Sequence, residues 1–165
     1  MKRMKKIMAV LLAAIMTMAM AVTAFAAEGA SGTNTLTVNV KDGQNLNGQT
    51  INLYKLFDVT ESNSGETTNY AYTVNTAIGY KDAIKSALGT SFTGTTDEEY
   101  AAAVLALKDT EGAVQKFAND FTADALTKNL SATATSGKIT EDSNKTSYTF
   151  NNLTAGYYLV YVTGG

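Results

Sequence analysis

Residues 150–160 read FNNLTAGYYLV, and this stretch decides the fold that we predict. Gly156 follows a polar segment and allows backbone angles that other residues avoid, so the chain can turn there. The side chains of residues 157–162 are all aromatic or aliphatic, which predicts a strand that follows the turn at Gly156. Because successive side chains of a strand point to opposite faces, we expect Tyr158 and Val160 to face the core. The same alternation places Tyr157, Leu159 and Tyr161 on the other face.

Two segments upstream show the period-two pattern of strands. Leu36, Val38 and Val40 alternate with polar residues, which predicts a half-buried strand. Residues 70–74 predict a further strand, and we interpret the polar segment 61–69 before it as a loop.

The segment 50–59 predicts another strand. Tyr54 and Leu56 lie on one of its faces, so we expect both faces to be at least partly covered. By the same period of two, the other face carries Ile51, Leu53, Phe57 and Val59.

The middle of the chain changes to helical periodicity. Residues 78–88 fit a short amphipathic helix that ends at Gly89, since glycine often closes helices. The pair Thr96 and Glu99 has the spacing of a capping box, which predicts a helix over 97–108.

A third helical stretch contains Val114 and Phe117 and reaches Leu126 or Leu130. Three short helices between strands indicate a helical insertion at about 77–130 rather than a strand-helix alternation. We therefore predict a mainly β fold, a β-sandwich with this insertion. Its expected core consists of Leu36, Val38, Ile51, Leu53, Phe57, Val74, Phe150, Tyr158 and Val160.

The beginning of the chain has the pattern of a secretory signal peptide. Four basic residues within positions 2–6 precede an apolar run over 7–22. Ala24 and Ala26 supply the small residues that signal peptidase needs, so we expect cleavage between Ala26 and Ala27. An uncleaved leader that anchors the chain is the alternative, since the run is about as long as a short membrane-spanning helix.

Composition narrows the classes of function. Cleavage would divide the chain into a leader (1–26), a flexible mature N-terminus (27–34) and one domain (35–165). Removing the leader leaves nine basic against 15 acidic residues, a net charge of −6. An acidic surface repels phosphates, so we expect no nucleic-acid partner, and contact with a membrane only through an uncleaved leader.

The chain has no Cys and no His. Their absence excludes thiolate chemistry, a Ser-His-Asp triad and zinc held by His. We therefore expect a protein that is not an enzyme, with no catalytic residue, no cofactor and no metal site.

Two segments together carry a resemblance to a known family. Residues 52–59 read NLYKLFDV, and residues 150–160 read FNNLTAGYYLV. In this order, after a signal peptide and around a helical insertion, they resemble the N-terminal domain of major pilins that sortases assemble in Gram-positive bacteria. These domains belong with the Cna B and other Ig-like surface proteins. The resemblance spans roughly Thr35 to Val162 and implies an Ig-like β-sandwich.

The resemblance implies a structural subunit of a cell-surface pilus, a fimbrial shaft that supports adhesion. The partners would be other pilin subunits in a covalent polymer and a sortase, with host surface ligands as a further class. The protein would lie in the cell wall or on the cell surface, or be secreted if the chain is complete as printed. No Pro and no LPxTG-like motif is present, so we expect the N-terminal part of a longer precursor. A complete, smaller secreted protein is the alternative.

The same family carries intramolecular isopeptide bonds between Lys and Asn or Asp. The resemblance places the Lys at an inward position of the first strand, where this chain has apolar residues, whereas Lys41 points outward. The position of the acid that promotes the bond holds Val162. Lys55 is the other candidate, and its simpler interpretation is a lysine at a sheet edge with its amine in water. We expect no isopeptide bond in this domain.

Two further classes of function remain as alternatives. A secreted or wall-attached adhesin or stalk module would bind host protein or glycan through loops such as 61–69 and 89–96. An enzyme without His or Cys would need paired carboxylates. The adjacent acids of residues 97–99 are better explained by the positive end of a helix dipole.

Overall fold

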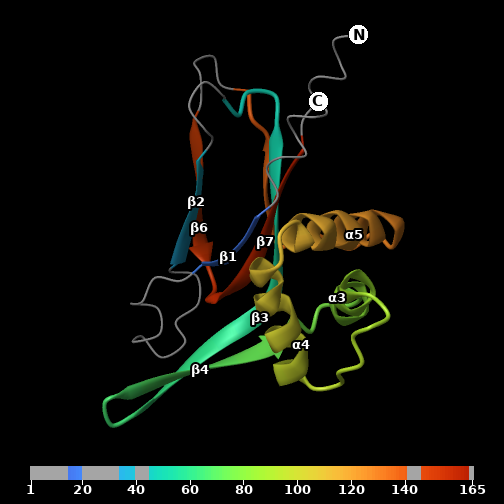
Figure 1. The fold of residues 1–165 in the computed structure, drawn as a ribbon. Coiled ribbons are helices and arrows are strands. Elements are labelled where there is room, and N and C mark those ends of the chain that lie inside the picture. Colours follow the sequence, from blue (N-terminus) through green and yellow to red (C-terminus); the bar gives the residue numbers. More distant parts are fainter. Residues whose placement is uncertain (1–14, 20–33, 40–44, 141–145, 164–165) are drawn as a thin grey trace.

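The structure is a computed structural model of the chain, and it describes residues 15–19, 34–39, 45–140 and 146–163. Within these ranges the elements follow one another as Figure 1 shows. They are β1 (Ile15–Ala19), β2 (Asn34–Asn39), β3 (Thr50–Ser64), β4 (Thr67–Val74), α3 (Tyr80–Leu88), α4 (Asp97–Leu105), the 3₁₀ helix η1 (Ala106–Asp109), α5 (Ala113–Thr127), β5 (Ala134–Lys138), β6 (Ser147–Leu153) and β7 (Gly156–Thr163).

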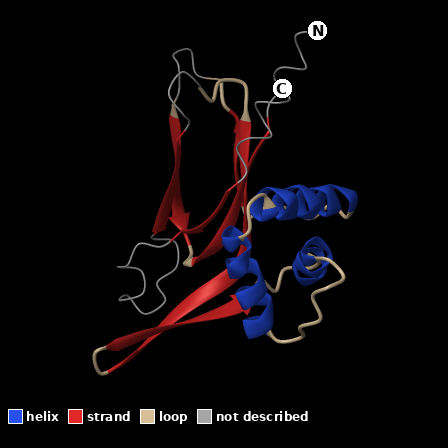
Figure 2. Cartoon of the chain, in the orientation of Figure 1, coloured by secondary structure: helices blue, strands red, loops and turns tan. Residues whose placement is uncertain are grey.

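Two antiparallel sheets organise the described strands (Figure 2). In the larger sheet the order is β1-β7-β3-β4, and β5 also pairs with β3. The smaller sheet consists of β2 and β6 and lies on one side of the larger sheet, with the helices on the other side (Figure 1). The prediction of a mainly β fold with a helical insertion is confirmed, and the paired sheets are compatible with a β-sandwich.

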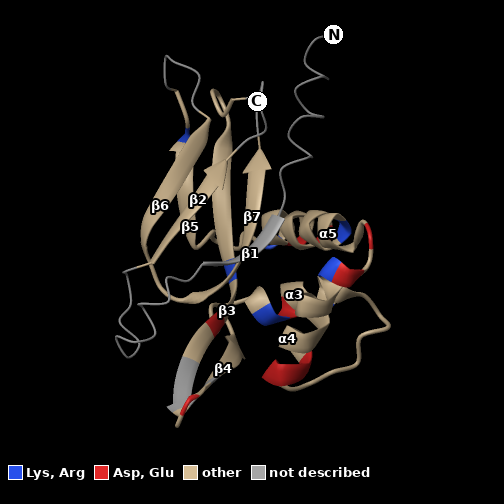
Figure 3. Cartoon of the chain, turned by 60° about the vertical axis from the view of Figure 1, so that its left-hand side comes forward, with Lys and Arg blue, Asp and Glu red and all other residues tan. Residues whose placement is uncertain are grey.

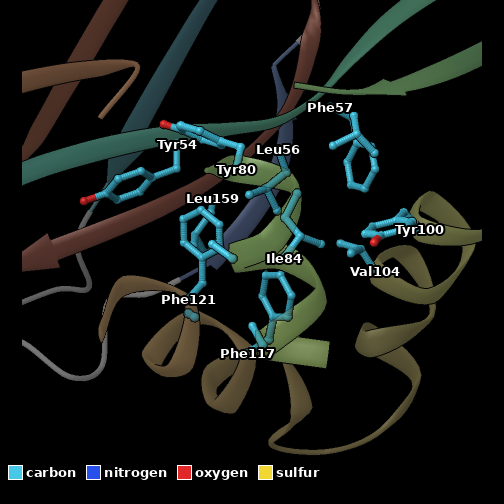
Figure 4. Close-up of a cluster of buried hydrophobic side chains, with 14 of the residues drawn as sticks. Tyr54, Leu56, Phe57, Tyr80, Ile84, Tyr100, Val104, Phe117, Phe121 and Leu159 are labelled. Carbon is cyan, nitrogen blue, oxygen red and sulfur yellow. The ribbon is translucent and has the colours of Figure 1, made fainter. Parts of the chain in front are cut away.

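Apolar side chains fill both sides of the larger sheet. The cluster between the two sheets contains Leu36, Val38, Leu46, Ile51, Leu53, Ile139, Phe150, Leu153, Tyr158, Val160 and Val162. The cluster beneath the helices is larger and includes the residues labelled in Figure 4: Tyr54, Leu56, Phe57, Tyr80, Ile84, Tyr100, Val104, Phe117, Phe121 and Leu159. All nine predicted core residues are buried. The alternation predicted for β7 is also confirmed, since its successive residues divide between the two clusters.

Strand β3 does not keep the predicted period of two along its length. Its register with β7 shifts between Lys55 and Phe57. Ile51 faces the smaller sheet, whereas Phe57 lies with Tyr54 in the cluster beneath the helices. The prediction that Phe57 and Ile51 share a face is therefore wrong. An irregularity in one strand inverts the alternation beyond it, and apolar residues on both faces hide this from the sequence pattern.

The segment 61–69 is not the loop that we predicted, because it forms the end of a β-hairpin. β3 and β4 pair out to Ser64 and Thr67, which leaves a two-residue turn. Gly65 in this turn has a φ of 67°, a backbone angle that glycine adopts without strain. The end of this hairpin extends beyond the other strands of the larger sheet (Figure 1). Because Ser64 and Thr67 are exposed, this end lacks the apolar alternation by which a strand is recognised in sequence.

The helical insertion lies where the sequence predicts it. α3 ends at Gly89, and α4 follows the capping box in which Thr96 Oγ1 accepts a hydrogen bond from the Glu99 N–H. The helix predicted over 97–108 is α4 continued by the 3₁₀ turn η1, and the third predicted helix is α5. The helix predicted over 78–88 begins later, at Tyr80, so the prediction that includes Ile78 in this helix is wrong. Ile78 precedes the helix and is 96% exposed.

Several predictions concern residues outside the described ranges, namely those on Ala24, Ala26, Ala27, Val40 and Lys41. One part of the predicted leader is described: β1 pairs with β7, from Ile15 opposite Val160 to Ala19 opposite Gly156. The sequence pattern predicted neither this strand nor the short polar strand β5. Among the described helices, none has the length and apolar character needed to cross a membrane.

Candidate functional site

The two segments that carry the family resemblance lie side by side in the structure. β3 contains the first segment and β7 contains the core of the second, and the two strands pair antiparallel. Tyr54 lies opposite Leu159, Lys55 opposite Tyr158, and Asp58 opposite Gly156. Residues about a hundred positions apart in sequence thus form one continuous surface at the centre of the larger sheet.

A cluster of polar groups marks the place where these two segments meet. The Lys55 amine lies 2.5 Å from Asp58 Oδ1 and donates a hydrogen bond of 3.0 Å to Thr154 Oγ1. Thr154 belongs to the short connection between β6 and β7, so the lysine links β3 to that connection. We call Lys55, Asp58, Thr154 and Tyr158 the Lys55 cluster.

Tyr158 completes the cluster from the buried side. Its hydroxyl donates a hydrogen bond of 2.7 Å to the Thr154 carbonyl oxygen. Burial raises the pKa of Tyr158 above its ordinary value; the Thr154 hydrogen bond lowers it and the charge of Asp58 raises it. The phenol therefore stays neutral and serves as a hydrogen-bond donor.

Gly156 allows the lysine stem to pass close to β7. A Cβ atom at this position would lie 2.7 Å from Lys55 Cδ and 2.7 Å from the Phe57 carbonyl oxygen. The backbone oxygen cannot move without disturbing the pairing of β3 and β7. Close approach of two chain segments, rather than an unusual φ, is thus the reason for glycine here.

The geometry of the Lys55 cluster is that of an ion pair that fixes a turn. The Lys55 side chain is 14% exposed and that of Asp58 is 41% exposed. The simpler interpretation of Lys55, a lysine at a sheet edge, is wrong. β3 is an inner strand of the larger sheet and pairs with β7 at this point. The hydrogen bond from the Lys55 amine to Thr154 Oγ1 ties this ion pair to the connection between β6 and β7.

A second candidate site lies beside residues 89–96, which connect α3 to α4. This segment is a loop, as predicted, and a shallow open depression separates it from α3. Asp82 and Lys85 of α3 line one side of the depression and Phe92 lines the other. The Phe92 ring packs edge-on against Tyr100, with 4.9 Å between the ring centroids. This contact gives the loop a fixed aromatic anchor.

Charged side chains are distributed unevenly over the described residues. Many of them lie on the helices, whereas β7 carries none (Figure 3). No group of three or more Asp, Glu, His or Cys residues that could hold a metal ion occurs in the described part of the chain.

Sequence reasoning identified Lys55 but did not connect it with Thr154 or Asp58. Asp58 lies three residues away, where a regular strand would place it on the opposite face. The register shift after Lys55 brings the two side chains together instead. No known protein-family model matches the chain, and no curated protein matches it.

Proposed function

We propose that this chain is a structural subunit of a sortase-assembled cell-surface pilus, exported through a cleaved leader, with an Ig-like sandwich as its domain. One observation supports this most strongly. The two sequence segments that resemble major pilins are neighbouring strands at the centre of one sheet. This pairing is compatible with one contiguous motif, as the resemblance implies.

The physical character of the domain suits a role as building material. β3 pairs with β4, β5 and β7, so one long strand joins most of the larger sheet. Apolar clusters on both sides of that sheet bury large side chains, each of which contributes about 1.5–3 kcal/mol. Stability of this kind needs neither disulfides nor metal ions, which suits a chain without cysteine.

Under this proposal the partners are other copies of the subunit, joined covalently, and the sortase that joins them. The protein lies in the cell wall or along a pilus, where it supports adhesion to host surfaces. The chain itself performs no catalysis, and the sortase supplies the reactive thiolate that this sequence lacks.

Cell-wall extracts test the proposal. We expect immunoblots of these extracts to show a ladder of high-mass species that survives boiling in SDS. Deleting the sortase gene should collapse the ladder to the single-subunit band. A single band of subunit mass in both strains would contradict polymerisation.

A secreted or wall-attached adhesin module is the second candidate, because the depression beside residues 89–96 offers a charged rim and an aromatic anchor. If the chain is such a module, Phe92→Ala should abolish adhesion to host protein or glycan. Under the pilin proposal the same variant leaves the polymer ladder unchanged. Ser91→Ala serves as the matched control, because Ser91 is an exposed residue of the same loop.

A further inference from the structure

The helix α3 has one buried face and one exposed face. Its buried residues, which belong to the cluster beneath the helices, are Tyr80, Ala83, Ile84 and Ala87. The residues on the opposite face are all exposed, and they are Lys81, Asp82, Lys85 and Ser86. α3 therefore presents a ridge to water, and this ridge carries charges of both signs.

An apolar side chain stands at one end of this ridge. Ile78 lies just before the helix and is 96% exposed, more than any other large apolar residue of the described ranges. It lines a shallow depression together with Lys81 and Asp82. Single exposed apolar residues are common on protein surfaces. The significance of Ile78 thus depends on what lies at the other end of the ridge.

The other end of the ridge is hollow. The depression beside residues 89–96 is lined by Asp82, Lys85, Gly89 and Phe92, among others. A Cβ atom at Gly89 would meet no atom of the described chain within 4 Å, apart from its neighbours in sequence. One face of the molecule thus has a projecting isoleucine, then an acid and a base, and then an open hollow with an aromatic side.

We propose that this face of α3 binds the same face of a second copy of the chain. The two helices would lie antiparallel around a two-fold axis that passes between Asp82 and Lys85, so that each contact occurs twice. Asp82 then lies opposite Lys85 of the second copy. Ile78 lies opposite Gly89 of the second copy, because both pairs are centred on the same point of the helix. The isoleucine of each copy thereby enters the hollow of the other.

The charges favour this occupant and this orientation. The antiparallel pair sets an acid opposite a base at two places, whereas a parallel pair would set Asp82 opposite Asp82. Within the described ranges, neither Asp82 nor Lys85 forms an ion pair with another residue. By contrast, α4 begins with three acidic residues, and two copies that met there would repel each other. This inference goes beyond the proposed function and does not depend on it.

Sedimentation velocity of the purified full chain over a series of concentrations tests the inference. We expect a reversible equilibrium between monomer and dimer. Asp82→Lys should raise the dissociation constant at least about tenfold, because like charges then lie opposite each other at two places. Lys85→Asp should have the same effect. The chain with both substitutions should associate about as well as the unchanged chain, because the exchanged charges are complementary again.

A second pair of variants tests the apolar contact. Ile78→Ser should weaken the dimer, because the side chain that enters the hollow is lost. Leu126→Ser is the matched control, since Leu126 is 78% exposed but belongs to α5, and this variant should associate like the unchanged chain. Circular dichroism establishes that every variant is folded, which the exposed positions favour.

Each outcome decides the inference. A chain that stays monomeric at every concentration overturns it. Association that the single charge reversals leave unchanged, or that the double exchange does not restore, overturns it as well. The same holds if Ile78→Ser and Leu126→Ser weaken association equally. None of these results bears on the proposed pilus, which the ladder in cell-wall extracts tests separately.

Discussion

At the scale of single residues, the junction of β3 and β7 depends on how closely two segments of backbone can approach. The Lys55 stem passes over Gly156, and its amine reaches Asp58 and Thr154. The Lys55 side chain is mostly buried, whereas the Asp58 side chain that it pairs with is substantially exposed to water. We therefore expect the backbone fit to matter more to stability than the charges.

Replacement of Gly156 by alanine tests the backbone fit. The added methyl group would meet the Phe57 carbonyl oxygen, so Gly156→Ala should lower the free energy of unfolding by about 1–3 kcal/mol. Urea unfolding followed by circular dichroism measures this. Gly94→Ala is the comparison, because the three atoms nearest to its methyl group would be side-chain atoms of Phe92 and Glu99. A loss in Gly156→Ala of less than about 1 kcal/mol would contradict the argument from backbone contact.

The Lys55 cluster should remain an ion pair without a covalent bond. The intact mass of the folded protein should equal the mass calculated from the residues that it retains, without the loss of one water that an amide between Lys55 and Asp58 would cause. Lys55→Met keeps the stem over Gly156 and removes the charge, so it should cost less than about 1 kcal/mol, since Asp58 is substantially hydrated. A mass deficit of one water that disappears in Lys55→Met would show that the bond forms.

At the scale of elements, local signals predicted the helices better than the strands. Thr96, Glu99 and Gly89 mark helix ends by hydrogen bonds that depend only on near neighbours. The limits of β3 and β4 depend on pairing between strands, and the face of Phe57 depends on an irregularity beside Lys55. The Lys55 cluster could not be predicted for the same reason, because Thr154 lies 99 residues away from Lys55. Short-range pattern carries no information about such contacts.

The capping box of α4 gives a prediction at this scale. Thr96→Ala removes the acceptor of the Glu99 N–H and should cost about 1 kcal/mol. Thermal unfolding measures the loss, and Thr95→Ala is the control, because the Glu99 carboxylate accepts from the Thr95 backbone N–H, which alanine retains.

The carboxylate of Glu99 should make the stability of the protein depend on pH in the acid range. Hydrogen bonds from the Thr95 and Thr96 backbone N–H groups, and from the Thr96 side chain, lower its pKa below the ordinary value. The stabilisation is therefore present above the ordinary pKa of a glutamate and is lost as pH falls through the lower folded-state value. Glu99→Gln should lose this part of the acid dependence. An unchanged acid-unfolding profile in Glu99→Gln would contradict the assignment.

At the scale of the whole molecule, tyrosines hold the sheet and the helices together. Tyr54 of β3 and Tyr80 of α3 both contact the Phe121 ring of α5, with centroid distances of 5.4 and 5.9 Å (Figure 4). Aromatic pairs in these orientations contribute about 0.5–1.5 kcal/mol beyond their burial. The helical insertion is thus part of the core rather than an appendage.

Buried tyrosines should make the fold sensitive to alkali. Burial raises the pKa of Tyr54, Tyr80, Tyr157 and Tyr158 above the ordinary value. Stability is complete below the ordinary tyrosine pKa and is lost as pH rises through the folded-state values, because the unfolded chain releases these protons first. Absorbance of ionised tyrosine should increase together with the loss of circular dichroism. Ionisation of all tyrosines before unfolding would contradict this.

Tyr80→Phe separates the ring from the hydroxyl in that experiment. The variant loses the hydrogen bond of 2.6 Å to the Ser131 carbonyl oxygen, so it should be about 1 kcal/mol less stable at neutral pH. Its stability should decline less steeply in alkali, because one fewer group ionises on unfolding.

The central claim is that this chain leaves the cell without its first 26 residues and serves outside it as structural material. The most direct test is the N-terminus of the protein, read by mass spectrometry separately in cytosol, cell wall and medium. The account predicts that the protein in the cell wall or medium begins at Ala27. Protein confined to the cytosol with residues 1–26 intact would contradict it.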